Sequence, residues 1–203
     1  IFMPMAMRSA TGFGTYNSNE VDEYLAGKQA SISASFRAYQ RNLSGHSTPK
    51  DLKTLGELIY AMFTEFNIDE DEFKATQASV SGQLANQEAD PQFIFSTKVM
   101  ETLFSSPRQR QLDTKIVNEA SREQILEIAH SMLANAADFT FTFVGNVDLD
   151  SLRSVVETYI ASLPAQQSDR KFAGENPALS IIKGSGVNTF TTPMPVSYTH
   201  LTL

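Results

Sequence analysis

The segment from Phe139 to Gly145 constrains the fold of this chain more than any other. It reads Phe-Thr-Phe-Thr-Phe-Val-Gly, so phenylalanine and threonine alternate with a period of two residues. Both residue types favour a pleated surface, and successive side chains of a strand point to opposite faces. The segment therefore predicts a strand with its phenylalanines in the core of a sheet. Asp148 then opens a helix that Pro164 closes, which completes a strand-helix unit.

A second strand signal lies nearer the start of the chain. Apolar and polar residues alternate over residues 29–36, and the alternation continues over residues 39–44. This pattern predicts an antiparallel hairpin with one buried face and a turn near Arg37–Ala38. Two short strands are also expected at residues 179–183 and 187–191, after a polar stretch that has the composition of a loop.

Helices account for most of the remaining chain. Apolar residues recur at helical spacing behind Ser, Thr or Asp, which favour a helix N-terminus. Helices are therefore predicted for residues 1–10, for 18–26 with Ser18 as the N-cap, and after Thr48, Asp69, Asp90, Ser121 and Asp148. Residues 11–14 are expected to interrupt the first two helices, and the segment with Arg108 and Arg110 to be a connector. The fold class is α+β, an antiparallel sheet packed by several helices.

Composition excludes several classes of function. Sixteen lysines and arginines stand against 23 acidic residues, which gives a formal net charge of -7. Such a chain lacks the positive field on which nucleic-acid binding depends, so no nucleic-acid partner is expected. It contains no cysteine, which removes thiol nucleophiles and cysteine-based metal sites. Its apolar runs are far shorter than the roughly 20 residues of a membrane span.

The histidines do not form a zinc-binding pattern. Two histidines one helical turn apart are needed to place both imidazoles toward one metal ion. The chain has only His46, His130 and His200, and neither HExxH nor HxxEH occurs. His46 is interpreted as a loop residue and His130 as a surface residue of a helix. We therefore predict no catalytic, metal-binding or cofactor-binding residue in this chain.

Other candidate motifs have simpler structural interpretations. A histidine beside a serine, as in His46–Ser47, is frequent by chance and lacks the context of a nucleophile elbow. Gly12–Gly14 lacks the third glycine of a dinucleotide-binding fingerprint. The acidic groups at 69–72 and at 148–150 lie where helix N-termini favour negative charge. The phenylalanines of residues 139–143 are interpreted as sheet core and not as a platform for nucleic-acid bases.

Two motifs resemble the insulinase/pitrilysin family of zinc metallopeptidases. Residues 141–148 read Phe-Thr-Phe-Val-Gly-Asn-Val-Asp, and residues 159–164 read Tyr-Ile-Ala-Ser-Leu-Pro. In that family a Phe-x-x-Val-Gly-Asn strand leads into a helix that ends in Tyr-Leu-x-Ser-Leu-Pro. Residues 21–28, 44–52 and 86–93 are similar to the second, metal-free half of the long bacterial members. The resemblance covers roughly residues 1–194.

The resemblance implies a clamshell of two homologous halves that close around an unfolded peptide. The zinc-binding HxxEH helix belongs to the N-terminal half, so zinc would be held outside this chain. The partners implied are that catalytic half, in cis or as a homologous subunit, and a peptide substrate. A periplasmic or cell-envelope location follows at the level of the family only. The leading hypothesis is the non-catalytic, substrate-chamber part of such a peptidase.

Two alternatives stay open beside it. The family contains members that have lost activity and serve as structural or partner subunits. A third possibility is a stand-alone peptide-binding domain whose exposed sheet edge accepts an extended peptide.

The resemblance also suggests how the chain is divided. Residues 1–164 are expected to form an insulinase/pitrilysin-like domain that lacks its first strands. Residues 165–194 are expected to hold a linker and the first strands of a similar domain. Residues 195–203 change character abruptly and are interpreted as a non-native tail. Because a truncated sheet exposes strand edges, self-association of such a fragment is expected.

Overall fold

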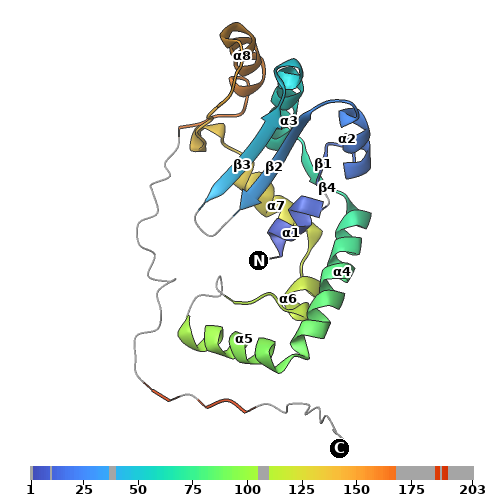
Figure 1. Ribbon diagram of the computed structural model, residues 1–203, viewed down its shortest axis with the longest axis vertical. Coiled ribbons are helices and arrows are strands. Elements are labelled where there is room, and N and C mark those ends of the chain that lie inside the picture. Colours follow the sequence, from blue (N-terminus) through green and yellow to red (C-terminus); the bar gives the residue numbers. More distant parts are fainter. Residues whose placement is uncertain are drawn as a thin grey trace, which may run out of the picture.

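The computed structural model confirms the α+β fold class (Figure 1). It describes residues 2–9, 11–36, 40–104, 110–167, 186–187 and 189–191. The described strands form two separate antiparallel pairs, β1 with β4 and β2 with β3. Helices pack around both pairs.

The predicted hairpin is present. Strands β2 (Ala30–Phe36) and β3 (Arg41–Ser47) pair antiparallel, in a register that runs from Ala30 opposite Ser47 to Phe36 opposite Arg41. Both ends of β2 are buried, which fixes the face that the hairpin turns to the core. The expected turn near residue 37 lies outside the described residues.

The second pair, β1 (Thr11–Phe13) with β4 (Phe66–Ile68), corrects the expected break at residues 11–14. Each strand has three residues, too few for a period of two to be visible in the sequence. Gly12 is required here because a Cβ atom at this position would lie 2.3 Å from the carbonyl oxygen of Tyr16. The glycine therefore allows the chain to fold back closely beside β1.

The N-terminal helices are α1 (Met3–Ser9), α2 (Ser18–Leu25) and α3 (Leu52–Thr64), the last preceded by a 3-10 turn at Pro49–Asp51. The N-cap of α2 is Asn17 and not Ser18. The Asn17 side chain accepts from the Glu20 N–H, and the Glu20 carboxylate accepts from the Asn17 N–H, which makes a capping box. Ser18 instead donates its hydroxyl to Glu72.

The later helices begin where their caps predict. They are α4 (Glu70–Glu88), α5 (Pro91–Leu103), α7 (Arg122–Leu133) and α8 (Leu149–Val155). Their N-caps are Asp69, Asp90, Ser121 and Asp148, and each accepts a hydrogen bond from a backbone N–H of the first turn. The sequence did not predict the short helix α6 (Thr114–Asn118) or the π-helical continuation of α8 over Val156–Ile160.

The core centres on α3. Its residues Leu58, Met62 and Phe63 join the main hydrophobic cluster, which also receives residues from α1, β4 and α7. Nearer the N-terminus of α3, Leu52 and Leu55 form a small second cluster with Val155 of α8. Helix α5, by contrast, contains no buried residue and lies at the end of α4 farthest from the hairpin (Figure 1).

Candidate functional site

The segment with the strongest strand signal is not part of a strand in this structure. Residues 139–144 belong to the connection between the 3-10 turn that follows α7, Ala136–Asp138, and helix α8. No backbone hydrogen bond joins residues 140–144 to another described residue. The prediction of a strand here is therefore wrong for the described part of the chain. The physical reason is that a strand requires a neighbouring edge within hydrogen-bonding distance, and no described strand pairs with this segment.

The side chains of this segment nevertheless face the core, as the alternation predicted. Phe139 and Phe141 are half-buried, whereas Thr140 and Thr142 are exposed. The Phe63 ring of α3 lies edge-on to Phe139 at a centroid distance of 5.0 Å, and 5.9 Å from the centroid of Phe141. Aromatic contacts of this kind stabilise by about 0.5–1.5 kcal/mol beyond the area that they bury. The segment is thus held by its side chains and not by its backbone.

A groove of about 360 Å³ separates this segment from the hairpin. One wall is residues 138–143, and the floor contains Leu55 and Ile59 of α3. The other wall belongs to the hairpin and is made by Ile32, Arg41, Asn42, Leu43 and Gly45. Because β3 is paired with β2 alone among the described strands, its second edge is free on this side.

Arg41 closes one end of the groove. Its guanidinium donates to the carbonyl oxygen of Met132 and lies 3.4 Å from a carboxylate oxygen of Asp138, whose side chain is only 3% exposed. The guanidinium carbon also lies 5.3 Å from the centroid of the Phe139 ring. These contacts anchor the first residues of the segment to β3. They also pair the two charged residues of the lining with each other, so the groove presents an otherwise uncharged surface.

The histidines are not brought together. His46 lies in β3 and is exposed, which corrects its interpretation as a loop residue. The Nε2 atom of His130, on α7, is 2.7 Å from the carbonyl oxygen of Phe66, and this contact covers the edge of β4. His200 lies outside the described residues. Within the part of the chain that the structure describes, no group of three or more His, Cys, Asp or Glu residues is placed to hold a metal ion.

In each of the two acidic groups the first residue, Asp69 or Asp148, acts as a helix cap, as predicted. The Asp69 carboxylate accepts from the N–H groups of Asp71 and Glu72. The Asp148 carboxylate accepts from the N–H and the hydroxyl of Ser151, and these hydrogen bonds hold the pKa of Asp148 below its ordinary value. Their carboxylates are therefore engaged in local structure.

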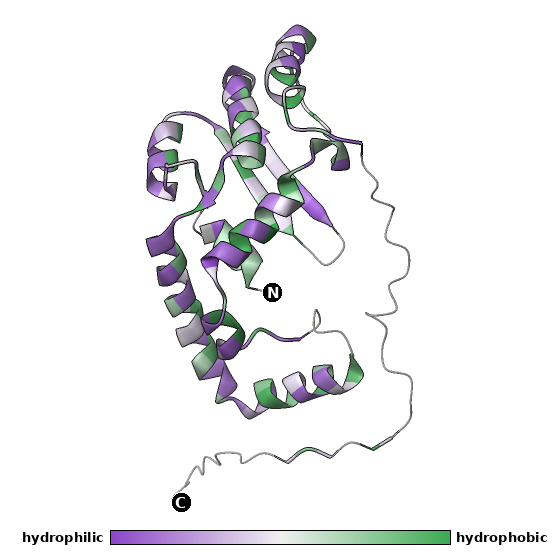
Figure 2. Cartoon of the chain, turned by 180° about the vertical axis from the view of Figure 1, so that it is seen from behind, coloured by the Kyte–Doolittle hydropathy of each residue, from purple (hydrophilic) through white to green (hydrophobic). Residues whose placement is uncertain are grey.

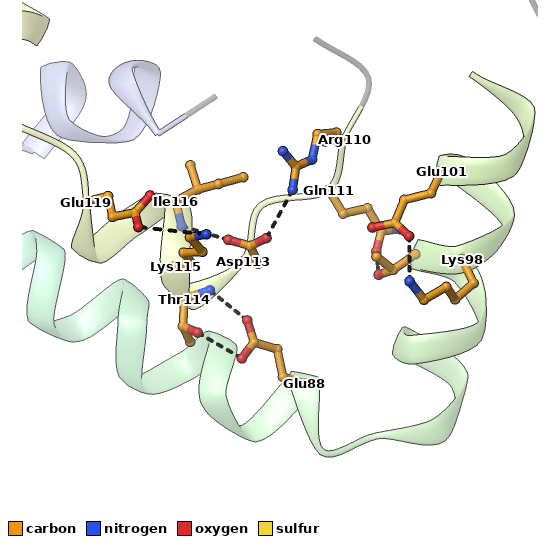
Figure 3. A network of polar contacts seen from close by, with 11 residues as sticks. Glu88, Lys98, Glu101, Arg110, Gln111, Asp113, Thr114, Lys115, Ile116 and Glu119 are labelled. Atoms are coloured by element: carbon orange, nitrogen blue, oxygen red, sulfur yellow. Dashed lines mark hydrogen bonds and ion pairs between the residues drawn. The ribbon is translucent and has the colours of Figure 1, made fainter. Parts of the chain in front are cut away.

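A polar network joins the end of α4 to α6 (Figure 3). The Glu88 carboxylate accepts from the N–H of Thr114 at 2.6 Å and from its hydroxyl at 2.9 Å. Asp113 accepts from the N–H of Ile116 and lies 4.0 Å from Arg110. Sequence reasoning missed this network, since only the Asp113 cap has a local signature. It fixes the connection after α5 and contains no catalytic arrangement.

The chain shares its fold with parts of two proteases of known structure. Two crystal structures share the fold. That of the periplasmic protease PqqL from Escherichia coli has a TM-score of 0.73 and 20% identity, with 89% of this chain and 20% of that chain covered. That of a mutant of the ferredoxin protease FusC, in complex with Arabidopsis ferredoxin, has a TM-score of 0.67 and 21% identity, with 84% and 19% covered.

Curated relatives agree with the structural comparison. The "Probable zinc protease PqqL" of Escherichia coli K12 is 21% identical over 189 residues, which are 93% of this chain and 20% of that protein. Its namesake from Haemophilus influenzae is 21% identical over 169 residues, which are 80% of this chain and 17% of that protein. No family model matches the chain.

The chain is a relative of the insulinase/pitrilysin-type zinc proteases, as its motifs indicated. It spans about a fifth of the length of the curated relatives that it matches. No helix among the described residues combines the length and the apolar composition needed to cross a membrane.

Proposed function

We propose that this chain is a non-catalytic part of an insulinase/pitrilysin-type zinc peptidase and contributes to the chamber that surrounds a polypeptide substrate. Hydrolysis would take place elsewhere in the complete protein, through a metal-activated water. The observation that carries this proposal is the match of 93% of the chain to only 20% of a zinc protease. This part of the protein would then help to bind the substrate and to close the chamber.

The positions of the histidines also support a zinc site outside this chain. A peptidase zinc site takes two histidines from one helix, so that both imidazoles face one ion. Here His46 is on β3 and His130 is on α7, where its ring contacts the Phe66 carbonyl. Neither has a second histidine on its own element. The zinc ligands of the complete protein would therefore come from residues outside this chain.

Further parts of the proposal come from the relatives. A periplasmic location is proposed because PqqL of Escherichia coli is described as a periplasmic protease. A protein substrate is proposed because the FusC structure contains ferredoxin. The division into a domain at residues 1–164, a linker with following strands at 165–194 and a non-native tail at 195–203 stays a prediction.

A structural or partner subunit of the same family is the second candidate. Its favouring observation is the same placement of the histidines on separate elements, since an inactive subunit also needs no metal ligands. The stand-alone peptide-binding domain is favoured by the free edge of β3 beside the groove.

The complete reading frame of the source gene distinguishes the candidates. We expect an HxxEH motif, followed by an acidic ligand, outside the residues of this chain. A complete protein without those ligands would instead favour the partner subunit. A reading frame that encodes little more than the residues of this chain would favour the peptide-binding domain.

A further inference from the structure

We propose that Asn135 is a positioning residue that fixes the course of the chain after α8. Its side chain holds residues 164–166 against the 3-10 turn that follows α7, so the polypeptide beyond them starts from a fixed point. This anchor is a property of the chain itself. Its use, to place the next part of a substrate chamber, rests on the proposed function.

The first observation is that the chain leaves the turn Ala136–Asp138 and returns to it. The N–H of Ala136 donates to the carbonyl oxygen of Pro164 at 2.9 Å, and Figure 1 shows the chain after α8 returning to this turn. Ala136 and Leu163 are both buried in the main hydrophobic cluster. Residues 139–163 therefore form an excursion whose start and end meet at one place.

The second observation is that the Asn135 side chain makes a contact that its capping role does not require. Its Oδ1 atom accepts from the N–H of Ala137 at 3.2 Å, which caps the 3-10 turn. The same atom accepts from the N–H of Gln166 at 2.9 Å. An amide oxygen has two lone pairs and can accept both hydrogen bonds. The second bond ties the returning chain to the turn.

The third observation is that Asn135 is itself held in place from β3. Its Nδ2 atom donates to Asp138 at 3.4 Å, and the other carboxylate oxygen of Asp138 lies 3.4 Å from the Arg41 guanidinium. Arg41 belongs to β3 and also donates to the carbonyl oxygen of Met132 in α7. A side chain whose partners are themselves hydrogen-bonded keeps one orientation. The anchor therefore rests on α7 and β3.

Helix α8 is held by different contacts. Its Val155 packs on Leu52 and Leu55 of α3, in the small second cluster. A shift of α8 on α3 would therefore not move residues 164–166. The part of the protein that follows is then placed relative to α7 and β3. Without the anchor it would sample other placements, which lowers the fraction of molecules that are competent to bind and weakens the apparent affinity by that factor.

Nitrogen-15 relaxation of this chain measures the anchor directly. We expect the Gln166 amide to have an order parameter of about 0.85, as in rigid backbone, and Asn135→Ala to lower it below about 0.6. Asn135→Asp keeps an acceptor oxygen and should leave Gln166 ordered. Asn86→Ala is the matched control, since Asn86 is exposed on α4. Circular dichroism confirms that each variant is folded.

A further variant separates the anchor from the packing of α8. Val155→Ala removes part of the contact of α8 with Leu52 and Leu55. Gln166 should keep its order in this variant. Disorder of Gln166 would show instead that α8 holds the returning chain, and would overturn the inference.

The positioning role is tested in the protein expressed from the complete reading frame. Fluorescein-labelled, unfolded casein is the probe, and its binding is followed by anisotropy with a zinc chelator present to prevent hydrolysis. We expect Asn135→Ala to raise the Kd by about fivefold, the equivalent of one hydrogen bond. Asn135→Asp and Asn86→Ala should bind like the unaltered protein.

Three results would overturn the inference. A flexible Gln166 in the unaltered chain would remove the anchor, whatever the variants do. Equal disorder of Gln166 in Asn135→Asp and Asn135→Ala would reduce Asn135 to a structural residue. An unchanged Kd in Asn135→Ala would reject the positioning role.

The outcome is separable from that of the proposed function. A complete protein that neither binds casein nor carries HxxEH would reject the chamber and its placement, while the relaxation data would still decide whether the anchor exists. A flexible Gln166 in a protein that carries HxxEH and binds casein would reject the anchor alone.

Discussion

At the scale of single residues, side chains cover a strand edge that a neighbouring strand would cover in a wider sheet. The edge of β4 is covered by two side chains of α7. Arg122 donates to the carbonyl oxygen of Ile68 at 2.6 Å and to the side-chain oxygen of Asn67 at 3.1 Å, and His130 contacts the carbonyl oxygen of Phe66. Capping of this kind protects a short strand from pairing with another chain.

Replacing Arg122 tests this edge contact. We expect Arg122→Ala to lower the free energy of unfolding by about 1–3 kcal/mol, because the Ile68 carbonyl loses a charge-assisted donor. Urea denaturation followed by circular dichroism measures the change. Lys115→Ala is the matched control, since the Lys115–Glu119 pair is exposed and 3.9 Å apart and should contribute less than about 0.5 kcal/mol. Equal effects of the two variants would contradict the assigned role.

The carboxylate of Asp51 gives a prediction for pH dependence. It accepts from the Gln29 N–H at 3.0 Å and from the Thr48 hydroxyl at 2.8 Å, and these hydrogen bonds lower its pKa from the ordinary 3.8. Since the folded state holds the lower pKa, the stabilisation is present above the unfolded value and is lost as the pH falls through the folded value. Carbon-detected NMR titration should place the midpoint below 3.8. A midpoint at or above that value would refute the predicted shift.

At the scale of elements, the packing of α8 on α3 depends on one glycine. A Cβ atom on Gly56 would lie 2.6 Å from Cδ2 of Tyr159 and 2.7 Å from Cγ1 of Val155. The hydroxyl of Tyr159 also donates to Glu57 at 3.3 Å. The π-helical turn that carries Tyr159 therefore lies directly against the backbone of α3.

Two glycine variants in helices separate packing from helix propensity. Gly56→Ala should lower the free energy of unfolding by about 1 kcal/mol, because overpacking costs about 1–3 kcal/mol and the gain in helix propensity returns about 1 kcal/mol. Gly82→Ala in α4 should raise it by about 0.5–1 kcal/mol, since nothing lies within 4 Å of its Cβ position. Thermal and urea denaturation measure both, and stabilisation by both variants would contradict the close packing.

Elements with local signals were predictable from the sequence, and elements that depend on distant partners were not. Asp69, Asp90 and Ser121 mark helix starts because a cap acts on the first turn alone. The strands β1 and β4 have three residues each and no period of their own. The phenylalanine segment had the strongest strand pattern, yet its pairing requires an edge that its own residues cannot supply. The groove lies beside this unpaired segment, so its presence could not be predicted from the sequence.

At the scale of the whole molecule, the chain has a core of its own but also surfaces that suit a larger protein. Helix α5 contains no buried residue, and its Phe95 is 60% exposed. Figure 2 shows hydrophobic residues along this helix, which stands apart from the hairpin and α3. Together with the open groove, this exposure is expected of a part that packs against further domains. The expected self-association of the isolated chain stays a prediction.

The central claim is tested most directly by peptide hydrolysis. A quenched fluorescent peptide is offered to this chain alone and to the protein from the complete reading frame, each with and without a zinc chelator. We predict hydrolysis by the complete protein that the chelator abolishes, and no hydrolysis by this chain. Chelator-sensitive hydrolysis by this chain alone would contradict the account, because the metal site would then lie within it.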